Sequence, residues 1–438
     1  MLGIFMSAAS GLMMSGVWGE SMIWMLCVSG VFLMSSSDSL SWKGGLSGEL
    51  DYIGWGLMLL SVWIGLMAVM GSKSVKIGNY LSSFFIVLNV SLLVGFVVSF
   101  YVSDFMMFYL SYESCLVPIF FLILGWGYQP ERAQAGIYML FYTLFGSLPL
   151  FFFIIKGTSV GCSYMHNMSM FWPSGGFFFV FLIGAFLIKF PMYSMHLWLL
   201  KAHVEAPLAG SMLLAGVMLK LGGYGLIRFL SIWPERMNYF SEFILCLSTW
   251  GGVVISLSCL RQMDMKLLIA SSSVVHMSMC VSGLLVLSEW GLKGSLFIMI
   301  AHGLCSSGLF YLAGVVYERS CSRSLIISKG LLSVMPSVSF CWFMLLVANM
   351  AGPPTLNLAG ELLLMIALVS VSKYLMIILG FMSFFSASYS LYLFSLSQHG
   401  VSVTSKSGFC SGFMVEHLVS SCHWLPLNVM IFCLFWLV

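Results

Sequence analysis

The sequence predicts an all-α, polytopic membrane protein with about fourteen transmembrane helices. Two observations support this fold class: 60% of the 438 residues are hydrophobic, and only 8% are charged. Soluble domains carry about 25% charged residues, which keep their surfaces in water. This chain cannot supply such a surface, whereas lipid solvates apolar side chains directly.

The apolar runs have the length that a membrane-spanning helix needs, which is about 20 residues. The first two runs meet at Glu20, and Asp104 divides the long apolar stretch 80–125. We expect spans at approximately 2–19, 21–36, 53–70, 80–102, 105–125, 136–155, 176–199, 207–228, 239–259, 266–288, 293–315, 331–368, 374–397 and 420–438.

The positions of Lys and Arg indicate an orientation, because inner loops carry an excess of these residues. If the N-terminus faces outward, ten of the 18 Lys and Arg residues fall in inner loops and six in outer loops or at span ends. The remaining two, Lys189 and Lys220, lie within spans. This bias favours both termini outside.

Two spans contain prolines that predict broken helices. Segment 331–368 is too long for one straight span and is interrupted by the Ala-Gly-Pro-Pro run 351–354, while Lys189 is followed by Phe190-Pro191. Proline removes a backbone donor and clashes with the preceding turn. Broken backbone at membrane depth is tolerated where protein or water satisfies it, so the break at 351–354 indicates a cavity, with a simple kink as the alternative.

The broken spans are the seventh and the twelfth, which suggests a repeat of five helices. Because five is odd, the two copies would have inverted membrane topologies, as in many transporters. The predicted organisation is an N-terminal group of three helices at 1–79, a first five-helix repeat at 80–228, a second at 229–397, and a C-terminal loop and helix at 398–438.

Six residues that can exchange protons fall near the middle of apolar spans. A charge at the bilayer centre costs about 2.5–3.5 kcal/mol or more, so these residues need a function or a partner. No arginine, which keeps its proton in proteins, is among them, and a proton relay therefore fits better than structural pairing. The six residues are Glu113, Lys189, Lys220, His276, His302 and Glu361.

A structural role remains the alternative for each of these residues. His276 and His302 are flanked by serines and could be hydrogen-bond donors between helices. Either glutamate could simply neutralise a lysine. We expect Glu113 and Lys189 to form a charge-coupled switch, and we expect Lys220 to share one hydrated axis with the two histidines and Glu361.

Other functional classes find no support in the sequence. The 12 cysteines form no C-x-x-C, and no phosphate loop or dinucleotide fingerprint occurs, so we expect no cofactor on this chain. The spacing of His196, His203 and Glu205 does not match a metal motif, and we expect no metal site. The net charge of +3 and the short basic runs argue against a nucleic-acid partner.

Several longer strings carry a resemblance to a known family. They are Gly125–Arg132 after Tyr112-Glu113-Ser114, then Lys189–Tyr193, His196–Pro207, Ala209–Met212, Leu219–Gly225 and Pro353–Glu361. In order and spacing, from about residue 80 to 395, they resemble the chain 4 family of mitochondrial NADH–ubiquinone oxidoreductase. Leu200 departs from the pattern, because this family usually has proline there.

The resemblance implies an antiporter-like, proton-translocating subunit in the membrane arm of respiratory complex I, a proton-pumping NADH:ubiquinone reductase. It implies that FMN, iron–sulfur clusters and ubiquinone belong to partner subunits, and that no redox chemistry occurs on this chain. The expected partners are neighbouring antiporter-like subunits and membrane lipids, in the mitochondrial inner membrane. The residues that match the family's proton-carrying positions are the same six: Glu113, Lys189, Lys220, His276, His302 and Glu361.

Two alternatives to this function stay open. A subunit of a multi-subunit cation/proton antiporter would share the fold and the Glu/Lys set, and span chemistry cannot separate the two. A purely structural membrane anchor is less favoured, because it would gain nothing from the insertion cost of six ionisable residues.

Overall fold

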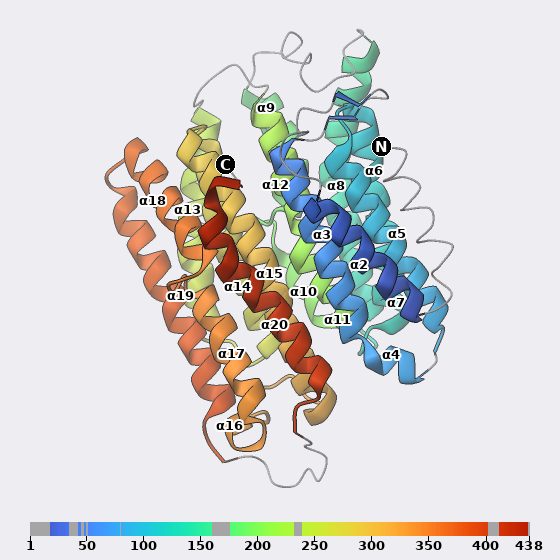
Figure 1. Ribbon diagram of the computed structural model, residues 1–438. Helices are drawn as coiled ribbons and strands as arrows, with labels where there is room; N and C mark the ends of the chain where they lie inside the picture. The colour runs from blue at the N-terminus through green and yellow to red at the C-terminus, as the bar shows by residue number, and fades with distance from the viewer. Residues whose placement is uncertain are drawn as a thin grey trace. The chain divides into compact units, whose positions relative to one another are not determined.

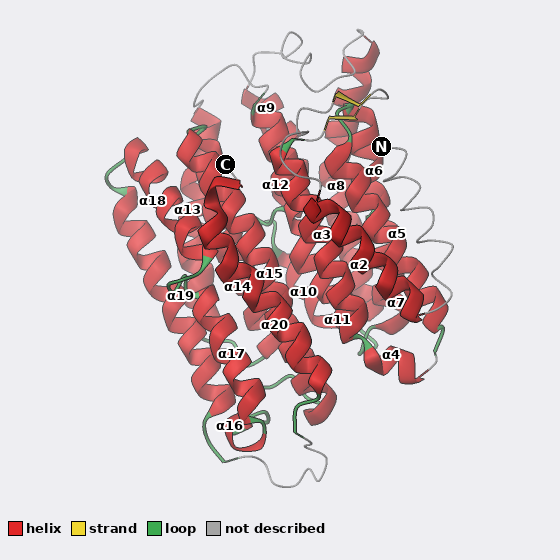
Figure 2. Cartoon of the chain, viewed as in Figure 1, coloured by secondary structure: helices red, strands yellow, loops and turns green. Residues whose placement is uncertain are grey.

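The computed structural model describes residues 18–34, 43–44, 48–49, 51–78, 80–159, 176–231, 239–401 and 411–436 (Figure 1). Helices dominate the described ranges, as predicted (Figure 2). The strands there are β1 (Lys43–Gly44) and β2 (Gly48–Glu49), which pair antiparallel. Most of the expected first span at 2–19 lies outside the described residues.

The chain divides into two compact units. The first comprises Met1–Phe190, Glu205–Ser241 and Phe435–Val438, and the second comprises Pro191–Val204 and Glu242–Leu434. The helices of the first unit are α2 (Trp18–Met34), α3 (Tyr52–Gly71), α4 (Lys73–Gly78), α5 (Ser82–Tyr101), α6 (Phe105–Ser114), α7 (Leu116–Trp126), α8 (Arg132–Ser159), α9 (Gly176–Lys189), α11 (Leu208–Leu213), the π-helix η4 (Leu214–Met218) and α12 (Leu219–Leu230).

The second unit holds the later helices and the second part of the broken seventh span. Its elements are α10 (Leu197–Glu205, whose last residue falls in the first unit), α13 (Tyr239–Cys259, from Glu242 onward), α14 (Met265–Leu285), α15 (Glu289–Ser320), α16 (Leu331–Val334), α17 (Pro336–Asn349), α18 (Leu356–Val371), α19 (Leu375–Gln398), α20 (Met414–Val429) and the 3-10 helix η5 (Met430–Trp436, to Leu434).

The helices match the spans predicted from the apolar runs. Within the described ranges, nine helical stretches are long and apolar enough to cross a membrane, and three shorter apolar helices accompany them. Asp104 separates α5 from α6, as predicted. The expected span 105–125 is interrupted by a turn at Cys115, which the apolar pattern did not reveal.

The surface of the spans is apolar, as lipid or a neighbouring membrane subunit requires. On α8, the exposed side chains include Phe141, Phe145 and Phe152, whose spacing places them on one face of the helix. By contrast, α14 and most of α15 are buried, and serines and glycines allow close packing along them. Helices α14 and α15 therefore carry the polar interior of the second unit.

Both predicted helix breaks are present. Helix α9 ends at Lys189, and regular helix resumes only at Leu197. In the other span, α17 ends at Asn349 and α18 begins at Leu356. The freed backbone of this second break finds local partners, because Thr355 Oγ1 donates to the carbonyl of Gly352 (2.7 Å) and Asn357 Nδ2 donates to the carbonyl of Ala348 (3.2 Å).

The predicted segment 331–368 contains three helices rather than two, because α16 precedes α17, which starts at Pro336. Proline is well suited to the first turn of a helix, where its missing N–H has no partner to lose. The depth of the breaks in the membrane, the inverted relation of the repeats and the four domains 1–79, 80–228, 229–397 and 398–438 stay predictions.

Candidate functional site

Lys189 occupies the last position of α9 and is 1% exposed. Its ammonium donates a hydrogen bond to the backbone carbonyl of Tyr112 (2.6 Å) and lies 3.0 Å from the centroid of the Tyr112 ring. The Tyr112 hydroxyl in turn donates to the carbonyl of Ala185, one turn before Lys189 (3.0 Å). The two residues thus connect α6 and α9 in both directions.

The position of Tyr112 explains why its carbonyl can hold an ammonium. Tyr112 lies in the last turn of α6, and the last carbonyl groups of a helix have no partner within that helix. The turn at Cys115 ends α6, so carbonyl oxygens of its last turn are available to donors from other helices. A cation over an aromatic face, away from water, gains about 2 kcal/mol, which offsets part of the cost of burying the Lys189 ammonium.

Glu113 is the next residue on α6, and it does not pair directly with Lys189. Within the part of the chain that the structure describes, neither oxygen of its buried carboxylate accepts a hydrogen bond. The two charges still interact electrostatically through space. Glu113 therefore lies next in sequence to Tyr112, and Tyr112 is the residue that binds the Lys189 ammonium.

Lys220 lies in the first turn of α12 and is 0% exposed. Its ammonium donates to the carbonyl of Ala215 (2.6 Å), which belongs to the π-helix η4 directly before it. Such π segments loosen the regular backbone bonding and are frequent at functional sites. Sequence reasoning found the lysine but missed the π-helix, for which the sequence carries no distinct signal.

Helix α12 approaches α9 very closely two residues after Lys220. A Cβ atom added to Gly222 would lie 2.7 Å from the backbone nitrogen of Phe190, the residue that follows Lys189. Only glycine permits this approach without a shift of the neighbouring backbone. The two buried lysines of the first unit thus lie on neighbouring helices that pack tightly beside the break.

The second unit brings three predicted residues into one buried cluster. His276 on α14 has its Nδ1 atom 3.5 Å from Oε1 of Glu361 on α18. Its ring centroid lies 5.5 Å from that of His302 on α15. On its other side, His276 Nε2 lies 3.5 Å from the hydroxyl of Tyr389 on α19. All four side chains are buried, and each comes from a different helix.

This arrangement can conduct protons through a single imidazole. A histidine ring can accept a proton at one nitrogen and release one from the other. At His276, Nδ1 faces the carboxylate of Glu361 and Nε2 faces the phenol of Tyr389. The ring can therefore take up a proton on one side and release one on the other. The separations of 3.5 Å shorten to hydrogen-bond length with a small side-chain movement. Sequence reasoning missed Tyr389, because a tyrosine in a span gives no particular signal.

The two histidines for which the sequence gave no metal motif, His196 and His203, stack on aromatic rings. The ring of His203 stacks flat on Phe310, with centroids 4.7 Å apart, and His196 stacks on Tyr193. Among the described residues, no group of three or more His, Cys, Asp or Glu side chains could hold a metal ion. His203 therefore contributes to the packing of an aromatic pair in the second unit.

Broken spans with buried Lys, Glu and His side chains define the class of antiporter-like membrane proteins. A family model described as "NADH:quinone oxidoreductase/Mrp antiporter, TM" matches residues 102–386. A second model, "NADH-ubiquinone oxidoreductase chain 4, amino terminus", matches residues 1–99. The chain belongs to the NADH-ubiquinone oxidoreductase chain 4 family.

Individual relatives agree with this assignment. The chain is 50% identical to NADH-ubiquinone oxidoreductase chain 4 of Ceratitis capitata over 397 residues, which cover 88% of each chain. It is 51% identical to the corresponding chain of Aedes aegypti over 395 residues, which cover 89% of this chain and 88% of the relative.

Solved structures share the fold at lower identity. A chain of respiratory complex I from Thermus thermophilus matches with a TM-score of 0.87 at 20% identity, over 99% of this chain and 96% of that chain. A chain of the Mrp complex from Dietzia matches with a TM-score of 0.82 at 17% identity, over 98% of this chain and 50% of that chain.

Proposed function

We propose that this chain moves protons across the mitochondrial inner membrane as an antiporter-like subunit of the membrane arm of respiratory complex I. The observation that carries the proposal is the buried row Glu361–His276–Tyr389, with His302 beside it. NADH oxidation and ubiquinone reduction then take place on partner subunits, which hold FMN, the iron–sulfur clusters and the quinone.

In the second unit, His276 is the proposed exchange point. A protonated Glu361 gives its proton to Nδ1 of His276, and the imidazolium releases the proton of Nε2 to the Tyr389 oxygen, which in the same step passes its own hydroxyl proton to a water molecule. The ring of His302, 5.5 Å away between centroids, offers a second acceptor through water. The carboxylate that remains at Glu361 then attracts the next proton. Each step moves one proton, and the two 3.5 Å separations at His276 need to close by less than about 1 Å, since a proton crosses a hydrogen bond of about 2.7–3.0 Å. The ring, now protonated at Nδ1, rotates before it accepts the next proton from Glu361.

In the first unit, Lys189 and Glu113 form the proposed switch. While Glu113 is ionised, its charge adds to the Tyr112 carbonyl and ring in stabilising the ammonium. When Glu113 takes up a proton, one of these three stabilising contributions is lost, and Lys189 gives up its proton more readily. Lys220, on the helix packed beside α9, is the proposed acceptor once it has given up its own proton and is a neutral amine.

The common hydrated axis expected for Lys220, His276, His302 and Glu361 remains part of this proposal. Lys220 belongs to the first unit and the other three residues to the second. The proposal requires that water connects residues whose side chains do not touch, as it does in other buried polar networks.

A cation/proton antiporter remains the second candidate function, because the Mrp complex shares the fold. The curated relatives at 50% identity favour complex I, since the likeness to the Mrp complex at 17% identity concerns the fold alone. The two functions differ in their driving reaction. Proton uptake that requires NADH and quinone, and that is unchanged by removal of Na⁺, supports complex I.

The variant His276→Gln tests the proposal, because glutamine keeps a hydrogen-bonding side chain that does not titrate. We expect the complex with this variant to assemble and to pump fewer protons per NADH in sealed vesicles. His423→Gln is the matched control, since His423 is a fully buried histidine of the same unit whose Nδ1 lies 2.8 Å from the carbonyl of Val419, outside the cluster. Equal pumping by both variants would remove His276 from the mechanism.

A further inference from the structure

Among the described residues, Lys266 is the third buried lysine, beside Lys189 and Lys220. It lies in the first turn of α14, at the end of a span, and is only 2% exposed. A lysine near the end of a span usually extends its ammonium into the interfacial water. The Lys266 ammonium instead faces α15, 5.8 Å from the centroid of the Tyr317 ring. Solvation at the membrane surface therefore does not explain its position.

A fixed structural cation is poorly placed at Lys266. The first turn of a helix is the positive end of its macrodipole, where a cation loses about 0.3–1 kcal/mol. Burial adds the cost of removing the ammonium from water. Arginine suits a buried permanent cation better, whereas lysine can also exist as a neutral amine. The residue type and its place therefore favour a group that gives up a proton and takes one up again.

Lys266 lies at one end of a contact between two helices that leads to the buried cluster of the second unit. We call this contact the α14–α15 seam, and the two helices lie side by side in it (Figure 1). Lys266 meets Tyr317 at one end of the seam, and the His276 ring meets the His302 ring farther along, with 5.5 Å between centroids. The two helices are therefore antiparallel, and about 15 Å of helix separates Lys266 from His276.

Small and polar side chains line the seam on α14. Lys266 is followed by Ala270, Ser273 and His276. Their spacing of three or four residues places them on one face of the helix. Ser273 is fully buried, and its hydroxyl donates to the Ala270 carbonyl (2.6 Å), so its oxygen can still accept a hydrogen bond from water.

The α15 side of the seam is similar. Ser306 is buried, and its hydroxyl donates to the carbonyl of His302, one turn away (2.6 Å). Farther from the histidines, Ala270 on α14 and Ala313 on α15, four residues before Tyr317, bring only methyl groups to the seam. Protons cross such a section only when water enters it, and an apolar constriction without water stops their return.

The Lys266 end of the seam is expected on the inner side of the membrane. Arg261 lies in the loop before α14, and Arg323 and Lys329 lie in the loop after α15. Loops rich in Lys and Arg face inward.

The other end of the seam leads to Glu361. Helix α18 packs on α15 one turn past His302, since a Cβ atom added to Gly360 would lie 2.6 Å from Cγ1 of Ile298. Glu361 follows Gly360 in the sequence and lies 3.5 Å from His276. The seam therefore joins the expected inner side to the carboxylate of the cluster.

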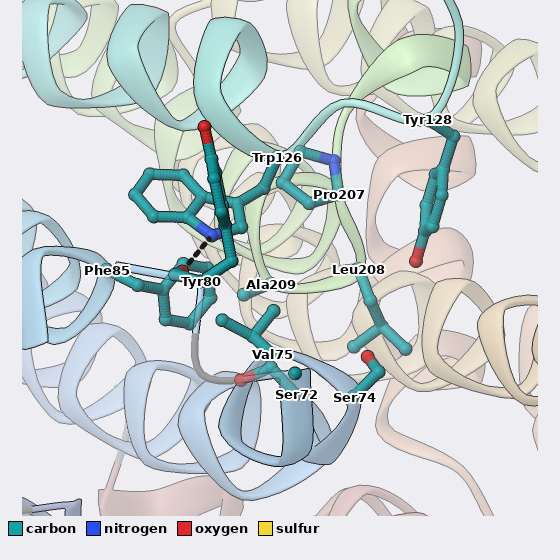
Figure 3. A pocket seen from close by; sticks show the side chains of 11 residues that line it. Ser72, Ser74, Val75, Tyr80, Phe85, Trp126, Tyr128, Pro207, Leu208 and Ala209 are labelled. Atoms are coloured by element: carbon teal, nitrogen blue, oxygen red, sulfur yellow. Dashed lines mark hydrogen bonds between the residues drawn. The ribbon is translucent and has the colours of Figure 1, made fainter. Parts of the chain in front are cut away.

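The pocket of the first unit lacks a group comparable to Lys266. Its volume is about 220 Å³, and it lies where α3 and α7 end. Figure 3 shows its serine and tyrosine side chains and the hydrogen bond from the Trp126 indole to the Tyr80 carbonyl (3.2 Å). None of its lining residues is Lys, His, Asp or Glu, so the pocket offers no side chain that exchanges protons near neutral pH.

We propose that Lys266 takes up protons from the inner side and passes them along the α14–α15 seam to the cluster of His276 and Glu361. This inference rests on the proposed function of that cluster. In each cycle the Lys266 ammonium releases one proton to water in the seam, and the Glu361 carboxylate takes up one proton at the other end. The neutral amine of Lys266 then regains a proton from water on the inner side. One proton thus enters for each proton that Glu361 gives to His276.

The variant Lys266→Arg tests the proposal, because arginine keeps the positive charge and does not release its proton. A structural cation would tolerate this change, whereas a proton-carrying lysine would not. We expect the assembled complex with Lys266→Arg to transfer protons through the second unit about a hundredfold more slowly, seen as fewer protons pumped per NADH in sealed vesicles. Lys373→Arg is the matched control, since Lys373 is an exposed lysine of the same unit between α18 and α19.

A measurement on the unaltered complex does not depend on how the variants assemble. Cyanate is the probe, because the isocyanic acid that it forms is small and carbamylates neutral amines but not ammonium groups. We expect mass spectrometry to find carbamyl groups on Lys266 during NADH oxidation and not in the resting complex, while Lys373 is modified equally in both states.

Two outcomes would overturn the inference: normal pumping by the assembled Lys266→Arg complex, or a Lys266 that stays unmodified by cyanate in both states. If His276→Gln still lowers pumping in either case, the proposed function stands and protons enter the cluster by another route. Normal pumping in both Lys266→Arg and His276→Gln would contradict the proposed function as well.

Discussion

Removal of the Tyr389 hydroxyl separates a proton-conducting role from a structural one. In Tyr389→Phe the ring stays and only the oxygen is lost, 3.5 Å from His276 Nε2. That separation is at the long limit of a hydrogen bond. A net hydrogen bond contributes about 0.5–1.5 kcal/mol to stability, so we expect a loss of about 0.5–1 kcal/mol in the free energy of unfolding. A loss of this size permits assembly.

The effect on proton transfer should be much larger than the effect on stability. A positioned acid–base group contributes about 10²–10⁴-fold to a proton-transfer step. We therefore expect the step through His276 to slow by about a hundredfold if the Tyr389 hydroxyl takes part in it. The assay is the number of protons pumped per NADH oxidised in sealed vesicles, measured with the amount of assembled complex.

Tyr311→Phe is the matched control, because Tyr311 is a buried tyrosine of α15 in the same unit. It should leave the pumping ratio unchanged. A normal ratio in the assembled Tyr389→Phe complex refutes the reasoning about this hydroxyl and leaves Tyr389 as a packing residue. A similar fall in both variants would also contradict it, since the loss would then be a general effect of removing a buried hydroxyl.

Three further predictions concern other parts of the chain. Gly222→Ala should destabilise the protein by about 1–3 kcal/mol, because the added Cβ would lie 2.7 Å from backbone. Gly184→Ala is the control, because a Cβ there meets open space. Thermal unfolding of the complex measures both variants. Arg319→Met should destabilise by about 1–3 kcal/mol, measured as assembled complex, since it leaves the half-buried Glu416 carboxylate with the Phe413 N–H as its remaining partner. Glu113→Gln should assemble yet pump fewer protons per NADH, and normal pumping would leave Glu113 with a structural role.

The helical framework could be predicted because lipid imposes strict demands on a sequence. Apolar length defined the spans, the charge of Asp104 marked the boundary between two of them, and the prolines at 191, 353 and 354 marked both breaks. The turn at Cys115 and the π-helix Leu214–Met218 could not be predicted in the same way. Both depend on a change of one or two backbone hydrogen bonds, and the packing of neighbouring helices determines whether that change occurs.

The site was predictable in its members but not in its pairings. The insertion cost of an ionisable group is a local property, so Lys189, His276 and Glu361 could be recognised from the sequence. Which group faces which depends on how α14, α15, α18 and α19 pack, and this placed His276 between Glu361 and Tyr389. The sequence predicted a charge-coupled switch of Glu113 and Lys189, and it gave no sign that the end of α6 offers Lys189 the carbonyl and ring of Tyr112.

The central claim is that buried side chains of this chain gain and lose protons during turnover. Infrared difference spectroscopy of the complex, resting and then oxidising NADH, tests it most directly, because a protonated carboxyl group has its own C=O stretching band. We predict a carboxyl band that changes with turnover and is absent in Glu361→Gln. A spectrum in which this substitution removes no turnover-dependent carboxyl band would contradict the account.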